Sequence, residues 1–306
     1  MPSFLALSVV WGSSFALIKV TLDGGLAPVW VAFGRCFFGA LTLATICLVR
    51  RESLPRCRAT WGHALAVAAL LNSVPFSLLA FGETHVSSVL AGIFNAITPL
   101  TTLLFVLLLV PQEQLTARRL SGLMVGFCGV LIVLGIWEGI GGASLIGSLA
   151  CIGSTVCMGA GFAYTRRHFS DREGSAVALS TTQLVCATAQ LAVLAPLFNG
   201  APDTLSAKPF TALVVLGALG TGVAYILNLG VIRVAGPTIA STVTYVIPIW
   251  STLFGTVLLS EPLSWNTAAG AVLVVAGVVL TRAPKGPAKS EPAAVSPDPE
   301  PEPRRH

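Results

Sequence analysis

The sequence predicts an all-α, polytopic membrane protein with ten transmembrane helices arranged as two inverted five-helix repeats. Its composition, its apolar runs and an internal repeat support this prediction. Of the 306 residues, 54% are hydrophobic and only 10% are charged, and the mean hydropathy is +0.83. Soluble globular domains have a charged fraction of about 25%. The solvent for most of this chain is therefore lipid, which excludes a soluble globular protein.

Ten runs are long and apolar enough to cross a membrane. Spanning about 30 Å of hydrocarbon takes about 20 apolar residues in a helix. The runs cover residues 3–22, 29–48, 61–81, 86–109, 116–136, 144–165, 175–197, 209–231, 237–259 and 264–281. The first run has no preceding basic residue and no small-residue cleavage pattern, so we expect a retained span rather than a signal peptide.

The basic residues predict the topology. They follow the even-numbered runs, for example Arg50 and Arg51 after the second, Arg118 and Arg119 after the fourth, and Arg166 and Arg167 after the sixth. Only Lys19 and Lys208 fall on the opposite side. The positive-inside rule then places both termini in the cytoplasm of a multi-pass protein of the cell (inner or plasma) membrane. The excess of positive charge is a topology signal, and we expect no nucleic-acid partner.

The two halves of the chain repeat one another. WGSSFALIK at residues 11–19 is echoed by MGAGFAYTR at 158–166. Further matches at offsets of 147 to 149 are Gly82 with Gly230, Pro99 with Pro248, Glu113 with Glu261, Gly122 with Gly270, and Gly129 with Gly277. We assign repeats to residues 1–137 and 144–281. Because each copy has an odd number of spans, the second enters the membrane from the opposite face, as in inverted-repeat transporters with a midplane site.

Other features limit the partners. Residues 282–306 are rich in proline and charge without apolar periodicity, which predicts a disordered cytoplasmic tail. The seven cysteines contain no C-x-x-C pair, so we expect no metal, redox or other cofactor. The expected partners are a small-molecule substrate and the lipid bilayer, and a homodimer stays an open option. Small residues such as Gly12, Ala16, Gly159 and Ala163 should let helices pack closely.

Polar side chains inside spans are the candidate cavity residues, because they are costly in hydrocarbon. The clearest is Arg35, about 10 Å below the outer surface at about 1.5 Å per residue. Its guanidinium group offers a bidentate fork for a carboxylate or phosphate. Snorkelling to the surface, or bracing a neighbouring helix, is the favoured alternative.

Polar stripes predict the rest of a solvated central cavity. With Arg35, the candidates are Trp11, Ser14, Asn72, Phe76, Asn95, Thr98, Tyr225, Asn228, Tyr245 and Pro248. A single Ser or Thr in such a stripe more often bonds to its own helix backbone. The position where the two copies differ most in bulk, Trp11 against Met158, is a candidate for substrate selection.

The acidic residues lie near span ends. We expect Glu113 and Glu261 to be interfacial anchors, and Glu83 and His85 to be a water-facing pair. Because no Asp or Glu lies near the middle of a span, a midplane carboxylate that exchanges a proton for a cationic drug has no candidate. The expected solute is neutral, zwitterionic or anionic, moved by exchange or facilitated flow.

The assembled motifs resemble the EamA family of the drug/metabolite transporter superfamily. They are WGSSF, Arg35 in the second span, ITPLTTLLF, PQEQLT and TYVIPIWSTLFGTVLLSEPLS, in an order that covers residues 3–281. The resemblance implies a ten-helix inverted-repeat exporter of small organic solutes. It also implies a cavity surrounded by helices 1, 3, 4, 6, 8 and 9, with helix 2 peripheral. PQEQL departs from the family pattern, which has Leu and Gly before the Glu.

Two other functions are alternatives to a transporter. An intramembrane serine protease needs a nucleophile with a partnered histidine, but His63, His85 and His168 lie at or beyond span ends. No H-E-x-x-H motif is present either, so we expect no enzyme. The remaining alternative is a membrane receptor or assembly scaffold, which needs no water-accessible cavity. The residues do not identify the substrate or a coupling ion.

Overall fold

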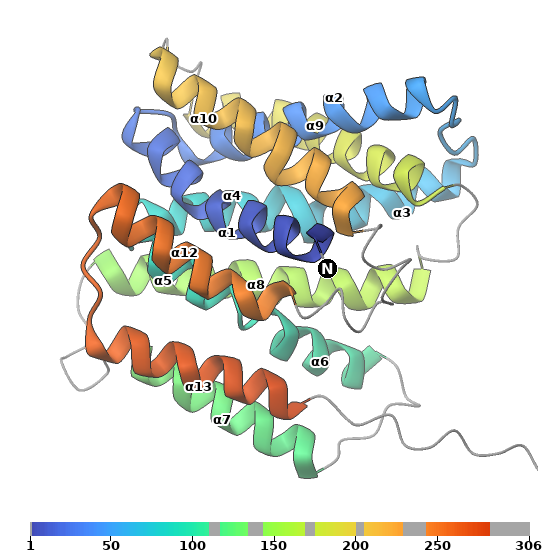
Figure 1. Ribbon diagram of the computed structural model, residues 1–306. Coiled ribbons are helices and arrows are strands. Elements are labelled where there is room, and N and C mark those ends of the chain that lie inside the picture. Colours follow the sequence, from blue (N-terminus) through green and yellow to red (C-terminus); the bar gives the residue numbers. More distant parts are fainter. Residues whose placement is uncertain are drawn as a thin grey trace, which may run out of the picture.

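The computed structural model describes residues 2–109, 117–133, 143–168, 175–199, 205–228 and 243–281, and these residues contain helices and no strand (Figure 1). The helices are α1 (Pro2–Asp23), α2 (Pro28–Val49), α3 (Arg58–Ala68), α4 (Val74–Glu83), α5 (Ser88–Asn95), α6 (Thr98–Leu109), α7 (Ala117–Val133), α8 (Ala143–His168), α9 (Ala176–Asn199), α10 (Ala207–Gly217), α12 (Val243–Leu259) and α13 (Trp265–Thr281). Two π-helical segments, η1 (Ala69–Ser73) and η3 (Ala218–Val223), continue α3 and α10. The tail at 282–306 lies outside the described residues.

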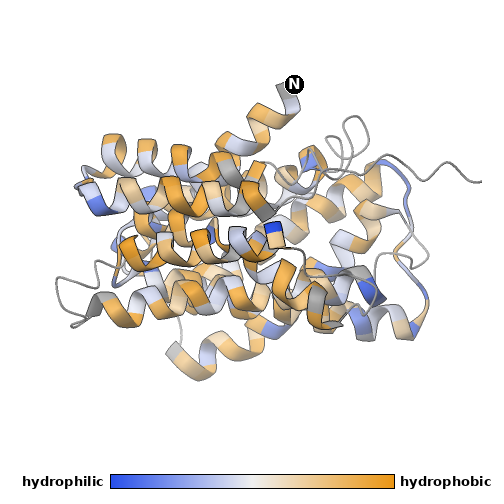
Figure 2. Ribbon diagram, turned by 90° about the horizontal axis from the view of Figure 1, so that it is seen from below, coloured by the Kyte–Doolittle hydropathy of each residue, from blue (hydrophilic) through white to orange (hydrophobic). Residues whose placement is uncertain are grey.

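Within the described residues, seven helical stretches are long and apolar enough to cross a membrane. They are Ser3–Asp23, Pro28–Val49, Arg58–Glu83, Ser88–Val106, Leu145–Thr165, Ala176–Phe198 and Ala207–Asn228, and shorter apolar helices occur at Leu120–Val133, Val246–Leu259 and Trp265–Gly277. Hydrophobic residues run along the helices, and hydrophilic residues gather mostly at their ends (Figure 2). The chain is therefore a multi-pass, all-α membrane protein. The count of ten spans remains a prediction.

The third predicted span is one continuous stretch with a change of helix type in its middle. Pro75 has no N–H to donate to the carbonyl of Leu71, so regular α-helical bonding cannot pass through this point. The chain instead passes through η1 just before the proline. The eighth predicted span also contains a π-helical segment, η3, in the glycine-rich stretch ALGTGV. The two segments begin 149 residues apart.

The main helix contacts are between pairs of helices that are distant in the sequence. α1 packs against α12 and α10, and α8 packs against α6 and α4. α2 packs against α9, and α7 packs against α13. In Figure 1, α7 and α13 lie side by side at one edge of the bundle, whereas α2, α9 and α10 lie at the opposite edge. Although the resemblance implies a peripheral second helix, α2 also packs against η3, α10 and α4, and its buried residues include Arg35.

The glycines of the echoed motifs permit close helix contacts, as predicted. A Cβ atom on Gly12 would lie 2.1 Å from the Cβ of Trp250 on α12. A Cβ atom on Gly159 would lie 2.7 Å from the backbone carbonyl carbon of Thr101 on α6. Each glycine therefore lets its helix approach another one more closely than a larger residue would allow.

Glu261 has a more specific role than the predicted interfacial anchor. Its carboxylate accepts hydrogen bonds from the backbone N–H groups of Ser88 and Val89, at 2.8 and 3.0 Å, and from the Ser88 hydroxyl at 2.9 Å. These N–H groups begin α5, where a helix lacks internal acceptors and favours negative charge. Glu261 therefore caps α5 from the connection between α12 and α13.

Replacing Glu261 with alanine should lower the free energy of unfolding by about 1–2 kcal/mol, the usual effect of losing a helix cap. Thermal denaturation of the purified protein in detergent measures the change. Glu261→Gln keeps one acceptor oxygen and should fall between the wild type and Glu261→Ala. Identical melting temperatures for all three proteins would contradict the capping role.

A polar network between four helices

Arg35 on α2 faces the interior of the bundle. Its Nε donates a hydrogen bond to Oγ1 of Thr221 in η3 at 3.0 Å, and its Cζ lies 3.9 Å from the centroid of the Phe76 ring on α4. The side chain is only 9% exposed. The snorkelling alternative is therefore wrong. The contacts with η3 and α4 are of the bracing kind that was also predicted.

Asn72 and Tyr225 lie on the two helical stretches that contact Arg35. Asn72 is four residues before Phe76, and Tyr225 is four residues after Thr221. Nδ2 of Asn72, in η1, donates to the Tyr225 hydroxyl at 3.3 Å. Nε2 of Gln183, on α9, donates to Oδ1 of Asn72 at 2.6 Å. Gln183 was not among the predicted cavity residues. The signal that would have revealed it is its position 148 residues after Arg35.

These six residues form three pairs related by the offset of the sequence repeat. We call them the central polar network: Arg35 with Gln183, Asn72 with Thr221, and Phe76 with Tyr225, at offsets of 148, 149 and 149. The bond from Arg35 to Thr221 has its counterpart in the bond from Gln183 to Asn72. Asn72 and Thr221 both lie in π-helical segments, which are frequent at functional sites. Each half of the chain thus contributes equivalent positions to one network.

The network contains a cation that forms no described ion pair, and the nearest acid acting on it is the buried carboxyl group of Glu83. In the described part of the chain, no hydrogen-bond acceptor contacts the two terminal nitrogens of Arg35. The facing groups are the Thr221 hydroxyl and the Phe76 ring, and neither carries a charge. A buried charge needs a partner to offset its desolvation. A carboxylate or phosphate that reached the two terminal nitrogens would supply one.

The profile of the EamA-like transporter family matches residues 2–135 and 145–283 of this chain. The chain belongs to this family. It is 28% identical over 290 residues to the Escherichia coli K12 protein named uncharacterized inner membrane transporter YedA, covering 91% of this chain and 89% of YedA. An uncharacterized transporter of Archaeoglobus fulgidus is 26% identical over 289 residues, covering 90% of this chain and 96% of that protein. These matches support a function in membrane transport.

A solved structure shows that the fold is shared. One crystal structure superposes on the EamA-like chain with a TM-score of 0.64 at 20% sequence identity, covering 92% of this chain and 95% of the other. At this identity the likeness concerns the fold alone. The relatives' names, like the family's, are those of transporters rather than enzymes.

The other predicted cavity residues of this EamA-like protein have no described hydrogen bond to the central polar network. Ser14 and Thr98 are buried and donate to the backbone carbonyls of Val10 and Asn95, which is the local bonding expected of such residues. Trp11, Asn95 and Asn228 are half-buried, and Pro248 is buried within α12. The side chain of Tyr245 lies outside the described residues. Of the predicted set, the structure joins Arg35, Asn72, Phe76 and Tyr225.

Glu83 does not face water, which corrects the prediction made for it. It is the last residue of α4, its exposed fraction is 0%, and both carboxyl oxygens lack a hydrogen-bond partner in the described part of the chain. Lys19 on α1 donates from Nζ to the backbone carbonyl of Glu83 at 2.9 Å. His85 is half-buried and contacts the Thr84 hydroxyl at 2.7 Å. Hydropathy located Glu83 at a span end but could not show that folding buries its side chain.

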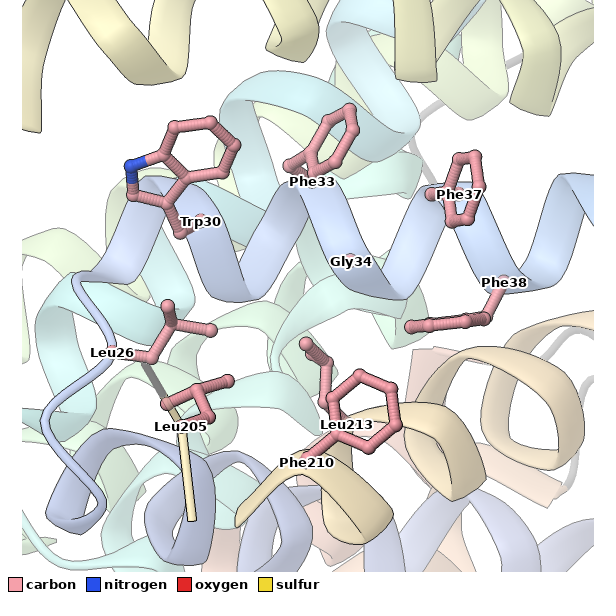
Figure 3. A pocket seen from close by; sticks show the side chains of 9 residues that line it. All are labelled: Leu26, Trp30, Phe33, Gly34, Phe37, Phe38, Leu205, Phe210 and Leu213. Carbon is pink, nitrogen blue, oxygen red and sulfur yellow. The ribbon is translucent and has the colours of Figure 1, made fainter. Parts of the chain in front are cut away.

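A hollow of about 330 Å³ lies between α2 and α10 (Figure 3). It is lined by Leu26, Trp30, Phe33, Gly34, Phe37, Phe38, Leu205, Phe210 and Leu213. Apart from the Trp30 indole N–H, these side chains have no polar group. Solute sites need a few placed polar groups to fix orientation. The lining of this hollow therefore lacks the polar groups that would orient a solute.

Proposed function

We propose that this EamA-like protein moves small organic solutes across the membrane by alternating access, with the central polar network as its solute site, and that export is the direction. The observation that carries the proposal is that both halves of the chain supply residues to the network. Its three pairs take equivalent positions from both halves of the chain, and they meet between α2, α4, α9 and η3. A site shared by two similar halves suits a carrier that exchanges two conformations of similar energy.

Contacts between α7 and α13 support an inverted pseudo-two-fold relation between the halves. A Cβ atom on Gly277 would lie 2.7 Å from the carbonyl oxygen of Gly122, and one on Gly270 would lie 2.7 Å from the carbonyl oxygen of Gly129. Exchanging the halves converts one contact into the other, as a two-fold axis requires. With five spans in each half, the second half is inverted, and the arginine distribution favours cytoplasmic termini.

Burial of the network explains how solute binding is linked to opening. Five of its six residues are buried, and Tyr225 is half-buried. Arg35 and Gln183 each lie seven positions after the first residue of their helix, Pro28 or Ala176, which is about 10 Å at 1.5 Å per residue. In inverted halves, the two residues are then reached from opposite membrane surfaces. Opening on one side exposes Arg35, and opening on the other exposes Gln183.

The chemistry of the network selects the solute class. Arg35 supplies a cation whose two terminal nitrogens have no described hydrogen-bond acceptor, whereas Gln183, Asn72 and Tyr225 supply neutral donors and acceptors. The favoured solute therefore has a carboxylate or phosphate at one end and neutral polar groups at the other. Phe76 and Tyr225 add aromatic faces that exclude water.

Gln183→Leu should reduce transport about 10- to 100-fold, because it leaves Oδ1 of Asn72 without its donor at a cost of about 1–3 kcal/mol. The measurement is uptake and export of a metabolite panel in proteoliposomes. Gln190→Leu is the matched control. Gln190 is also on α9, and its amide bonds with Leu65 and Ser73 outside the network. Equal losses of transport in both variants would contradict the proposed site.

Accessibility separates a carrier from a receptor or scaffold. Single cysteines at Asn72, Asn95 and Asn228, in a protein whose seven native cysteines are replaced, should react with an impermeant maleimide from both sides of sealed vesicles. A carrier exposes its site to each side in turn. Reaction from one side only, or from neither, would favour the receptor or scaffold.

A further inference from the structure

Glu83 is a buried acid that the proposed solute site does not use. Both of its carboxyl oxygens lack a hydrogen-bond partner in the described part of the chain. The nearby ammonium group of Lys19 donates to the backbone carbonyl of Glu83, at 2.9 Å, rather than to the Glu83 carboxyl group. Lys19 and Glu83 are thus in contact without forming a side-chain ion pair.

This geometry fits a carboxyl group that carries its proton. An ionised carboxylate that is buried without hydrogen bonds is strongly unfavourable, so such a group is neutral or acquires a partner. A partner is within reach, because the Lys19 ammonium already contacts the main chain of Glu83. Rotation of the Glu83 side chain toward Lys19 would form a charge-assisted hydrogen bond. The residue therefore has two states, one protonated and unpaired, the other deprotonated and paired.

We propose that Glu83 carries a proton through the transport cycle and that Lys19 is its partner when the proton has left. The proposal rests on the proposed function. When the ends of α1 and α4 separate, the O–H bond of the Glu83 carboxyl breaks and the proton passes to water on the side then open. The carboxylate then pairs with the Lys19 ammonium, and closure requires reprotonation. Transport is therefore coupled to protons, in place of the exchange or facilitated flow expected from the sequence.

Charged and titratable groups from several elements surround Glu83. They are Lys19 and Asp23 on α1, Arg35 on α2, His85 after α4, Cys151 on α8, and Glu261 between α12 and α13. The two cations attract a carboxylate at this position, and the two acids repel one. Of the two cations, Lys19 contacts the residue directly, so it is the one assigned as partner.

Glu83 is linked mechanically to the central polar network. It lies seven residues after Phe76, which is two turns along the same face of α4. Phe76 in turn lies under the Arg35 guanidinium group at 3.9 Å. A movement of α4 that exposes Glu83 therefore also displaces a residue of the solute site. Proton release and solute release are connected through one helix.

The first test needs no solute. Infrared difference spectroscopy of the purified protein across a pH titration should show the C=O band of a protonated carboxylic acid that disappears at high pH. Glu83→Gln should lack this band, and Asp23→Asn, which removes an exposed acid at the same end of the bundle, should keep it. Lys19→Met removes the partner of the carboxylate and should move the midpoint of the band to higher pH.

The second test measures coupling. In proteoliposomes with a metabolite panel, a pH gradient should drive transport by the wild type and by Asp23→Asn. Glu83→Gln should still exchange solute but ignore the gradient. A titrating band that survives in Glu83→Gln, an unmoved midpoint in Lys19→Met, or a gradient response in Glu83→Gln would overturn the proposal. If the wild type transports no solute, the proposed function fails, while the infrared result still decides whether Glu83 titrates.

Discussion

Replacing Arg35 with glutamine is expected to reduce transport of carboxylate- or phosphate-bearing solutes by about 10- to 100-fold. A hydrogen bond to a charged group contributes about 1.5–3 kcal/mol, and about 1.4 kcal/mol corresponds to a factor of ten. Flux of anionic and neutral solutes into proteoliposomes measures the effect. Neutral solutes should be affected less, because they do not need the charge.

Thermal stability distinguishes solute binding by Arg35 from bracing. Replacing a buried charge by a neutral group of similar shape removes a desolvation penalty, so Arg35→Gln should melt at the same temperature as the wild type or higher. If Arg35 served only to brace α2 against η3, the variant would melt at a lower temperature and would lose transport of anionic and neutral solutes equally. That result would contradict its assignment to solute binding.

The double variant Arg35→Gln with Gln183→Arg moves the charge to the equivalent position in the other half. Gln183 contacts Asn72 as Arg35 contacts Thr221, so the network has a place for the transferred guanidinium group. Partial recovery of anion transport relative to Arg35→Gln is expected. Recovery would support the equivalence of the two halves, and no recovery, with the double variant folded, would argue against it.

Gly277→Ala is expected to lower the free energy of unfolding by about 2–3 kcal/mol, the typical effect of overpacking. A Cβ atom at this position would lie 2.3 Å from the backbone nitrogen of Gly126 and 2.6 Å from its Cα. Backbone atoms cannot rotate aside as a side chain can, so α7 and α13 must separate. Thermal denaturation and size-exclusion chromatography in detergent measure the loss.

Gly153→Ala is the matched control for Gly277→Ala. It makes the same change inside α8, where the nearest atom to the new Cβ would be Cδ1 of Leu78 at an ordinary 3.6 Å. This variant should be as stable as the wild type or more stable, because alanine favours a helix by about 1 kcal/mol relative to glycine. Equal stability of the two variants would show that the α7 and α13 contact is less close than described.

Much of the fold was predictable because each membrane helix has its own signal in the sequence. Apolar runs and a low charged fraction identify membrane helices whatever their neighbours are, since each helix satisfies its own backbone in lipid. The glycines at 12 and 159 were predictable as packing sites for a similar reason. The predicted third span also formed as expected, with Pro75 as the visible cause of a change in helix type.

The residues of the central polar network were less predictable, because whether a residue belongs to it depends on which way its side chain faces. Ser14 and Thr98 bond to their own helices, whereas Asn72 and Tyr225 bond across to other helices. Hydropathy does not distinguish these cases. Gln183 was missed because a single amide within an apolar run gives no hydropathy signal, and only its position 148 residues after Arg35 could have revealed it.

The sequence alone predicted a membrane protein of the EamA family built from two similar halves, because composition, hydropathy and repeat offsets are properties of the chain order. Only the tertiary structure placed Arg35 against Thr221, 186 positions away, and buried Glu83 beside Lys19 of α1. Hydropathy locates a residue along the membrane normal, but the rotation of each helix decides whether it meets lipid, water or another polar group.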